Sequence, residues 1–168
     1  MKEVEQMADE TIASFFQKDH ERLDRFFDEF QAVKACDAIG AREHFENFRR
    51  GLERHMAWEE EILFPLFESK TGMASGGPTQ VMRLEHEQLK GLMKSLGEKM
   101  KQEELGDEGE ESALLGLLAQ HNQKEENILY PMIDQSITKE ERKRIFDKIN
   151  ASSASSPRGC CGLHPHEE

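Results

Sequence analysis

The segment HMAWEEEILFP (residues 55–65) returns as HNQKEENILYP (residues 121–131), 66 positions later. A second match has the same offset, because Asp-His-Glu at 19–21 corresponds to Glu-His-Glu at 85–87. In each half, one histidine therefore precedes the next by 35 residues. Two matches at one offset indicate an internal duplication. We expect two helical hairpins related by a pseudo-two-fold axis, each presenting equivalent side chains to a shared centre.

The hydrophobic spacing is helical almost throughout, with breaks near residues 35–40, 71–78, 105–109 and 136–138. Four segments carry an inner face whose residues step by three and four. These faces comprise Ile12, Phe16, His20, Leu23, Phe27 and Phe30; then Phe45, Phe48, Leu52, His55, Glu59, Ile62 and Leu66; then Met82, His86, Leu89, Met93, Leu96 and Met100; and finally Leu114, Leu117 or Leu118, His121, Glu125, Ile128 and Met132. Short connections predict an all-α, up-down-up-down antiparallel four-helix bundle.

The bundle is expected to be one domain over residues 1–150. Thr138 and Glu141 form a capping box, which predicts a short fifth helix. Pro65 and Pro131 are expected to end or kink their helices. Residues 151–168 read as a flexible Ser-rich tail with nothing to bury. Its two thiols and two imidazoles could capture a soft metal or act in redox exchange, or could be incidental; they belong to Cys160, Cys161, His164 and His166.

The charge balance argues against two classes of partner. The chain has 34 acidic and 22 basic residues and a net charge of -12, which would repel nucleic acid and anionic membranes.

The longest uncharged apolar run, residues 62–67, is far too short to cross a bilayer. No signal peptide is readable, and three cysteines make no disulfide framework, so a reducing cytoplasm is the expected location.

Six polar residues lie on inner faces that should be buried: His20, His55, Glu59, His86, His121 and Glu125. Taken singly, such a histidine is typical of a hydrogen-bonded core and such a glutamate of a solvated edge. Together they need a compensating positive charge, because a buried unpaired carboxylate costs several kcal/mol. No arginine or lysine occupies these faces, so a metal centre is the favoured interpretation.

The His-x-x-x-Glu spacing suits a pair of ions. It places an imidazole and a carboxylate one helical turn apart on the same face, so the carboxylate can reach across to bridge two metals. Each ion would then receive two imidazole nitrogens and two bridging carboxylate oxygens. Such ligands suit iron or manganese, with zinc possible, and disfavour thiolate-binding metals.

The repeated His-x-x-x-Glu-Glu-x-x-Leu-Phe/Tyr-Pro segments, with His20 and Glu85-His86-Glu87, resemble the hemerythrin-like, HHE cation-binding family over residues 8–135. The resemblance implies a non-haem, carboxylate- and oxo-bridged centre of two iron ions. It assigns His20 and His55 to one iron and His86 and His121 to the other, with Glu59 and Glu125 as the bridges.

The sequence departs from oxygen-carrying hemerythrins at two places. Lys90 stands where they have a second histidine in the third helix, and His121-x-x-x-Glu125 replaces their His-x-x-x-x-Asp. The four-histidine, two-glutamate set instead resembles the domain of proteins for the repair of iron centres. This likeness implies chemistry with O2, NO or peroxide in sensing, detoxification or repair under stress.

Alternative functions use the same residues differently. A ferroxidase or peroxidase would turn over O2 or peroxide, whereas a storage or delivery protein would pass iron to a partner. A plain interaction bundle would bind no stoichiometric metal. Lys90 is expected to be a solvent-facing neighbour of the site and not a pocket donor to a bound ligand. His44 could line an access route or be an extra ligand, but a surface or edge histidine is the favoured interpretation. Trp58 is expected to provide packing that keeps one side of the site dry.

Overall fold

The computed structural model describes residues 10–102 and 108–154, which form helices and short loops with no strand among them. Four long helices carry the predicted faces: α2 (Ile12–Val33), α3 (Ala38–Trp58), α5 (Pro78–Lys101) and α6 (Glu108–Lys124). Two of them continue through a π-helical turn, α3 through η1 (Glu59–Leu63) into α4 (Phe64–Thr71) and α6 through η2 (Glu125–Leu129) into α7 (Tyr130–Ser136). A last helix, α8, covers Lys139–Ala154. The predicted all-α bundle with a short fifth helix is confirmed.

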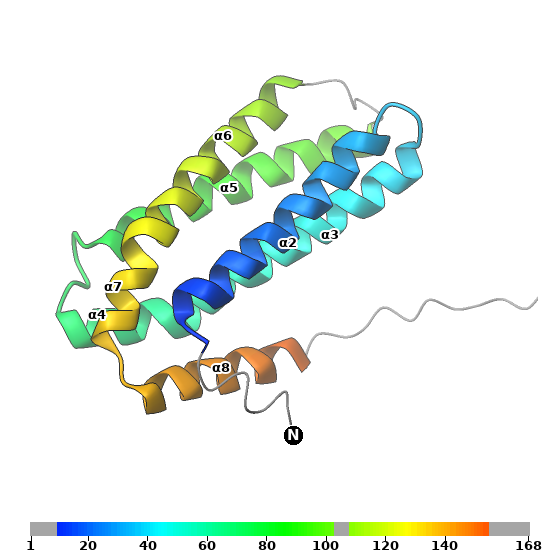
Figure 1. Cartoon of the computed structure of the whole chain (residues 1–168). Helices are drawn as coiled ribbons and strands as arrows, with labels where there is room; N and C mark the ends of the chain where they lie inside the picture. The colour runs from blue at the N-terminus through cyan, green and yellow to red at the C-terminus, as the bar shows by residue number, and fades with distance from the viewer. Residues whose placement is uncertain (1–9, 103–107, 155–168) are drawn as a thin grey trace, which may run out of the picture.

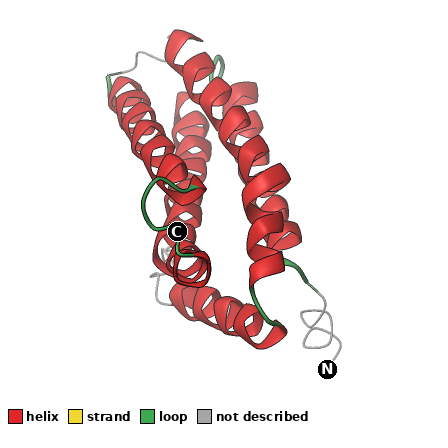
Figure 2. Cartoon of the chain, turned by 90° about the vertical axis from the view of Figure 1, so that its left-hand side faces the viewer, coloured by secondary structure: helices red, strands yellow, loops and turns green. Residues whose placement is uncertain are grey.

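Each hairpin of the duplication is a pair of neighbouring helices, α2 with α3 and α5 with α6 (Figure 1). The hairpins meet where α3 contacts α5 and α2 contacts α7. Helix α8 lies across the end of the bundle at which α2 begins (Figure 1). Figure 2 shows the bundle turned by 90°, with short loops between consecutive helices. None of the described helices is long and apolar enough to span a membrane.

The start of α2 is capped by residues that are far apart in the sequence. Thr11 and Ser14 form a capping box, in which the Ser14 amide donates to Thr11 Oγ1 at 3.0 Å. The carboxylate of Asp134 on α7 accepts from the first two amides of the helix, those of Ile12 at 2.9 Å and Ala13 at 3.0 Å. Because the first amides of a helix have no partner within it, Asp134 ties the end of the bundle to its beginning.

Two apolar clusters fill the bundle, one on each side of a polar level. The cluster near α8 contains buried aromatic residues, Phe16, Phe64, Phe67 and Tyr130, with aliphatic residues of α7 and α8. The cluster at the opposite end contains Phe27, Phe30, Phe45 and Phe48 with leucines and methionines of α5 and α6. On α2, His20 lies between Phe16 of one cluster and Leu23 of the other. The polar level therefore has dry layers on both sides.

The two π turns shift the inner face of their helices by one position. The sequence spacing places Ile128 on the inner face, and this is wrong, because Ile128 is 55% exposed. Ile62, Leu66 and Met132 are only partly buried. The buried residues are instead Leu63, Phe64 and Phe67 in the first copy and Leu129, Tyr130 and Ile133 in the second. A π turn pairs each amide with the carbonyl five residues back, so it adds one residue and rotates everything that follows.

The same turns explain why the helices continue through their prolines. Pro65 and Pro131 stand near the start of α4 and α7, and the chain stays helical to Thr71 and Ser136. Of the two predicted effects, an end or a kink, the helix end is not found at these prolines. A proline ring clashes with the carbonyl four residues back in a regular helix, and the wider turn before it gives that ring room.

Helix α8 runs four residues past residue 150, where the sequence analysis places the end of the domain. Its buried face, Ile145, Phe146 and Ile149, packs on the cluster near the start of α2. The indole N–H of Trp58 donates to Ser152 Oγ at 3.0 Å, which gives the last turn of α8 a partner. The tail residues Cys160, Cys161, His164 and His166 lie outside the described residues.

Candidate metal centre

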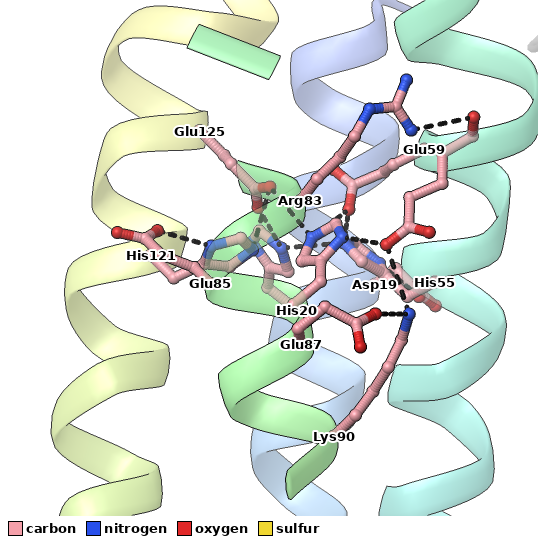
Figure 3. A network of polar contacts seen from close by, with 12 residues as sticks. Asp19, His20, His55, Glu59, Arg83, Glu85, Glu87, Lys90, His121 and Glu125 are labelled. Atoms are coloured by element: carbon pink, nitrogen blue, oxygen red, sulfur yellow. Dashed lines mark hydrogen bonds and ion pairs between the residues drawn. The ribbon is translucent and has the colours of Figure 1, made fainter. Parts of the chain in front are cut away.

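Six side chains from both hairpins converge on the polar level (Figure 3). They are His20 on α2, His55 on α3, His86 on α5, His121 on α6, and Glu59 and Glu125 at the first residue of each π turn. None is more than 3% exposed. The structure thus brings together every residue that the sequence analysis assigned to a metal centre. Their role as ligands stays a prediction.

The ligand atoms form two groups, within each of which all atoms lie within 4.8 Å of one another. Position 1 consists of His20, His55 and Glu125, and position 2 of His86, His121, Glu59 and Glu125. At position 1, His20 Nε2 lies 3.0 Å from His55 Nε2 and 3.4 Å from Glu125 Oε2. At position 2, His121 Nε2 lies 3.0 Å from Glu125 Oε1, and His86 Nε2 lies 3.2 Å from Glu59 Oε2. Glu125 therefore contributes one oxygen to each position.

Three buried atoms at this level have no hydrogen-bond partner: Glu59 Oε2, Glu125 Oε1 and His86 Nε2. Buried polar atoms are almost always paired, since an unpaired one keeps its full desolvation cost. Their three residues belong to one group of possible metal ligands. Carboxylate oxygens and imidazole nitrogens are atoms of the kind that bind metal ions. The donor set therefore fits a metal ion.

The outer nitrogen of each histidine is held by a carboxylate. The four Nδ1-to-carboxylate distances are 2.9 Å for His55 to Asp19, 2.9 Å for His121 to Glu85, 2.8 Å for His20 to Glu126 and 2.7 Å for His86 to Glu60. When Nδ1–H donates to a carboxylate, the Nε2 lone pair faces the centre. This arrangement prepares all four imidazoles to bind a metal through Nε2.

The sequence analysis missed these four carboxylates, although the duplication contained the signal. Asp19 and Glu85 each precede a centre histidine at the offset of 66, and Glu60 and Glu126 each follow a centre glutamate at that offset. Spacing alone does not say which histidine each one reaches. Asp19 and Glu85 bind within their own hairpin, whereas Glu60 and Glu126 cross to the other one.

Basic residues at the rim hold two of these carboxylates in turn. Arg22 Nε donates to Asp19 at 2.7 Å, and Lys124 donates to Glu85. Burial would raise the pKa of Asp19, but its bonds to His55 and Arg22 lower it to about 2. For Glu85, burial also opposes the change, and Lys124 and His121 lower its pKa. Both carboxylates are therefore anionic acceptors at neutral pH.

In the metal-free protein, protons supply positive charge to the centre. Burial would lower the pKa of His20, but the Glu125 carboxylate, with Glu126 and Glu59, raises it to about 9. Burial likewise opposes protonation of His86, whose pKa Glu125 and Glu59 raise to about 10. The pKa of Glu125 itself lies well below its usual value, because contacts with three histidines outweigh burial. A cation, whether a proton or a metal ion, is what these side chains require.

Tyr130 is a centre residue that the sequence analysis did not identify. It is fully buried, and its hydroxyl donates to Glu59 Oε1 at 2.7 Å and contacts Glu125 Oε2 at 3.0 Å. Burial and the two carboxylates raise its pKa well above the usual value. The signal in the sequence was the exchange of Phe64 for Tyr130, which adds a hydroxyl at one of the repeated positions. Only the extra residue of the π turn directs that side chain inward.

Lys90 lies outside the centre. Its Nζ contacts Glu87 at 2.9 Å and Glu60 Oε1 at 3.4 Å, and its side chain is 37% exposed. Figure 3 shows the side chain of Lys90 extending toward the rim of the site from the lower part of the view. Lys90 is therefore a solvent-facing neighbour, as predicted, and it contacts the carboxylate that holds His86.

His44 and Trp58 also lie away from the ligand atoms. The side chain of His44 is 33% exposed at the edge of the bundle, with Nδ1 3.0 Å from Glu29. It belongs to neither metal position, as the sequence analysis predicts. Trp58 is nearly buried, and its ring lies 6.0 Å from that of Phe15. It seals the side of the bundle that α8 covers.

A family model described as "Hemerythrin HHE cation binding domain" matches residues 11–133. The matched range covers α2 through most of α7 and includes all six converging residues. No curated protein and no solved structure gives a significant match to the chain.

Proposed function

Because this chain belongs to the hemerythrin HHE cation-binding domain family, we propose that its polar level holds two iron ions that bind or react with O2, NO or peroxide. His20, His55 and Glu125 would hold one ion, and His86, His121, Glu59 and Glu125 the other. The observation that supports this proposal is the set of three buried atoms without a hydrogen-bond partner, which lie between two apolar layers in a site that requires positive charge. Manganese and zinc are the competing metals for the same donors.

The surroundings of the positions favour a small ligand. The protein offers each position at most two imidazoles and two carboxylates, which leaves room in the coordination sphere for an exogenous ligand. Apolar clusters close the level from both sides, so a large or strongly charged ligand would lose its hydration without compensation. When bound, iron would supply redox and Lewis-acid chemistry.

The donor set also supports the finer likeness to proteins that repair iron centres. Four histidines and two glutamates are the set that this likeness requires, and Lys90 at the rim does not add a fifth imidazole. Fewer imidazoles leave more of each ion open to O2, NO or peroxide. These features favour reaction with such a ligand as well as its reversible binding.

Metal analysis of the untagged protein is the deciding experiment, with Cys160→Ser and Cys161→Ser introduced so that the tail thiols cannot contribute. We expect about two irons per chain and an optical spectrum that changes on reduction and on exposure to NO. His86→Ala should lose metal, whereas His44→Ala, a surface histidine, should keep it. Absence of stoichiometric iron after anaerobic reconstitution would refute the proposal. Catalytic turnover of peroxide or Fe²⁺ would instead identify the alternative, a peroxidase or ferroxidase.

A further inference from the structure

The two halves of the centre differ at the first residue after each π turn. Tyr130, the chain's single tyrosine, stands where the first copy has Phe64. The Phe64 ring stacks on His86 with centroids 6.0 Å apart and offers no polar atom. The Tyr130 hydroxyl lies on the other side, 3.4 Å from His55 Nε2. A nearly symmetric centre therefore has a phenol at position 1 and a phenyl ring at position 2.

Because of this exchange, the two oxygens of each carboxylate differ in whether they contact the tyrosine hydroxyl. The oxygens that contact Tyr130 are Glu59 Oε1 and Glu125 Oε2, and the latter is the oxygen of position 1. The opposite oxygens, Glu59 Oε2 and Glu125 Oε1, face position 2 and have no hydrogen-bond partner. The orphaned His86 Nε2 also belongs to position 2. Position 1 is thus internally satisfied, and every orphaned atom of the centre is at position 2.

We propose that Tyr130 makes the two metal positions inequivalent, so that position 2 takes up the first divalent ion and position 1 the second, more weakly. The inference deepens the proposed function and rests on the same six donors. Tyr130 acts here as a positioning residue, because it acts on the carboxylates that would bind the ions.

The order follows from what each ion must displace. An ion entering position 2 meets two carboxylate oxygens, Glu59 Oε2 and Glu125 Oε1, that no hydrogen bond occupies. An ion entering position 1 must compete with the phenol for Glu125 Oε2. It must also separate the paired nitrogens of His20 and His55, which lie 3.0 Å apart. A hydrogen bond from a hydroxyl to a buried carboxylate is among the stronger ones, so this competition weakens binding at position 1.

Titration of the metal-free, full-length protein with Co²⁺, followed by calorimetry and by visible absorption, tests the order. The wild type should bind two ions in separate steps whose affinities differ at least about tenfold, which corresponds to about 1.4 kcal/mol. In Tyr130→Phe, the second step should strengthen by about that factor and approach the first. His55→Ala should keep the tight step and His121→Ala should lose it, with circular dichroism showing that each variant is folded.

The duplication supplies a matched pair of variants. Phe64→Tyr adds the phenol to the other copy and should weaken the first step, and the double variant Phe64→Tyr/Tyr130→Phe should move the tight step to position 1. Two equal steps in the wild type, or an unchanged ratio in Tyr130→Phe, would overturn this inference and leave the proposed function standing. If the wild type binds no Co²⁺ and no iron, the proposed function fails with it.

Discussion

At the scale of single residues, the centre depends on which nitrogen of each histidine is free. Each Nδ1 lies within 2.9 Å of a carboxylate oxygen, so Nε2 is the atom left for a metal. Carboxylates of this kind also make the imidazole a better donor and fix its ring. Metal affinity should therefore depend on residues that never contact the ion.

Glu85→Gln tests this dependence. The change keeps the length of the side chain but removes the negative charge of the carboxylate, which accepts a hydrogen bond from His121 Nδ1 at 2.9 Å. We expect metal affinity at position 2 to fall about 10- to 100-fold, with little change in helicity. Competition with a coloured chelator measures the fall. Glu98→Gln, an exposed change on the same helix, is the control, and equal affinities for the two variants would contradict the orienting role.

Glu125→Gln tests the sharing of one carboxylate by two ions. Glu125 Oε2 lies 3.4 Å from His20 Nε2, and Oε1 lies 3.0 Å from His121 Nε2. Removing its charge should therefore lower occupancy at both positions, to well below one ion per chain. Mass spectrometry of the metal content gives the stoichiometry. Glu61→Gln, an exposed glutamate on the first π turn, should keep both ions, and one full ion retained in Glu125→Gln would rule out a shared bridge.

At the scale of elements, the π turns decide which residues face the centre. Glu59 and Glu125 are the first residues of η1 and η2, and the amides of Phe64 and Tyr130 bond back to them across five residues. Without the inserted position, the residues after each glutamate would follow the regular spacing and Tyr130 would turn away. A short irregularity in each helix thus brings the carboxylates and the phenol to one level.

The role of α8 is structural, and Phe146→Ala should separate it from metal binding. The Phe146 ring is buried and lies 5.1 Å from that of Phe15. Its loss should reduce the free energy of unfolding by about 3–5 kcal/mol, the usual cost for a buried phenylalanine. Urea denaturation gives the change, and metal content should stay at the wild-type value. The exposed change Lys148→Ala should have little effect, and a loss of metal in folded Phe146→Ala would show that α8 supports the centre directly.

At the scale of the whole molecule, the metal-free protein encloses negative charge and balances part of it with protons. The pKa of His20 is raised from 6.5 to about 9 and that of His86 to about 10, in both cases against the effect of burial. Glu125 is the leading carboxylate behind both shifts. The stability of the metal-free state should therefore depend on pH in a window set by these two groups.

The direction of this dependence follows from linkage. The folded protein holds these protons more tightly than the unfolded chain, so their stabilising contribution is complete below about pH 6.5. It is lost as the pH rises through about 9 for His20 and about 10 for His86. The Tm of chelator-treated protein should fall between pH 7 and 10. Glu125→Gln should flatten the fall, and a Tm that rises over this window would contradict the assignment.

Much of this organisation could be predicted from the sequence, because a repeat at one offset fixes both topology and symmetry. The four helices and the convergence of six side chains follow from residues such as His55 and Glu59 recurring as His121 and Glu125. The extra residue of each π turn could not be predicted from the sequence, because it leaves no signal in the hydrophobic spacing. The one nearby mark is a proline six residues after each glutamate. The inward position of Tyr130 was missed for that reason, and the exposure of Ile128 was predicted wrongly.

The crossing of Glu60 to His86 and of Glu126 to His20 has a consequence for the origin of the fold. Position 1 takes both its imidazoles from the first hairpin but its carboxylate from the second, and position 2 takes Glu59 from the first. Neither hairpin encloses an ion by itself. A half-length ancestor would thus need a second copy of itself to complete either position.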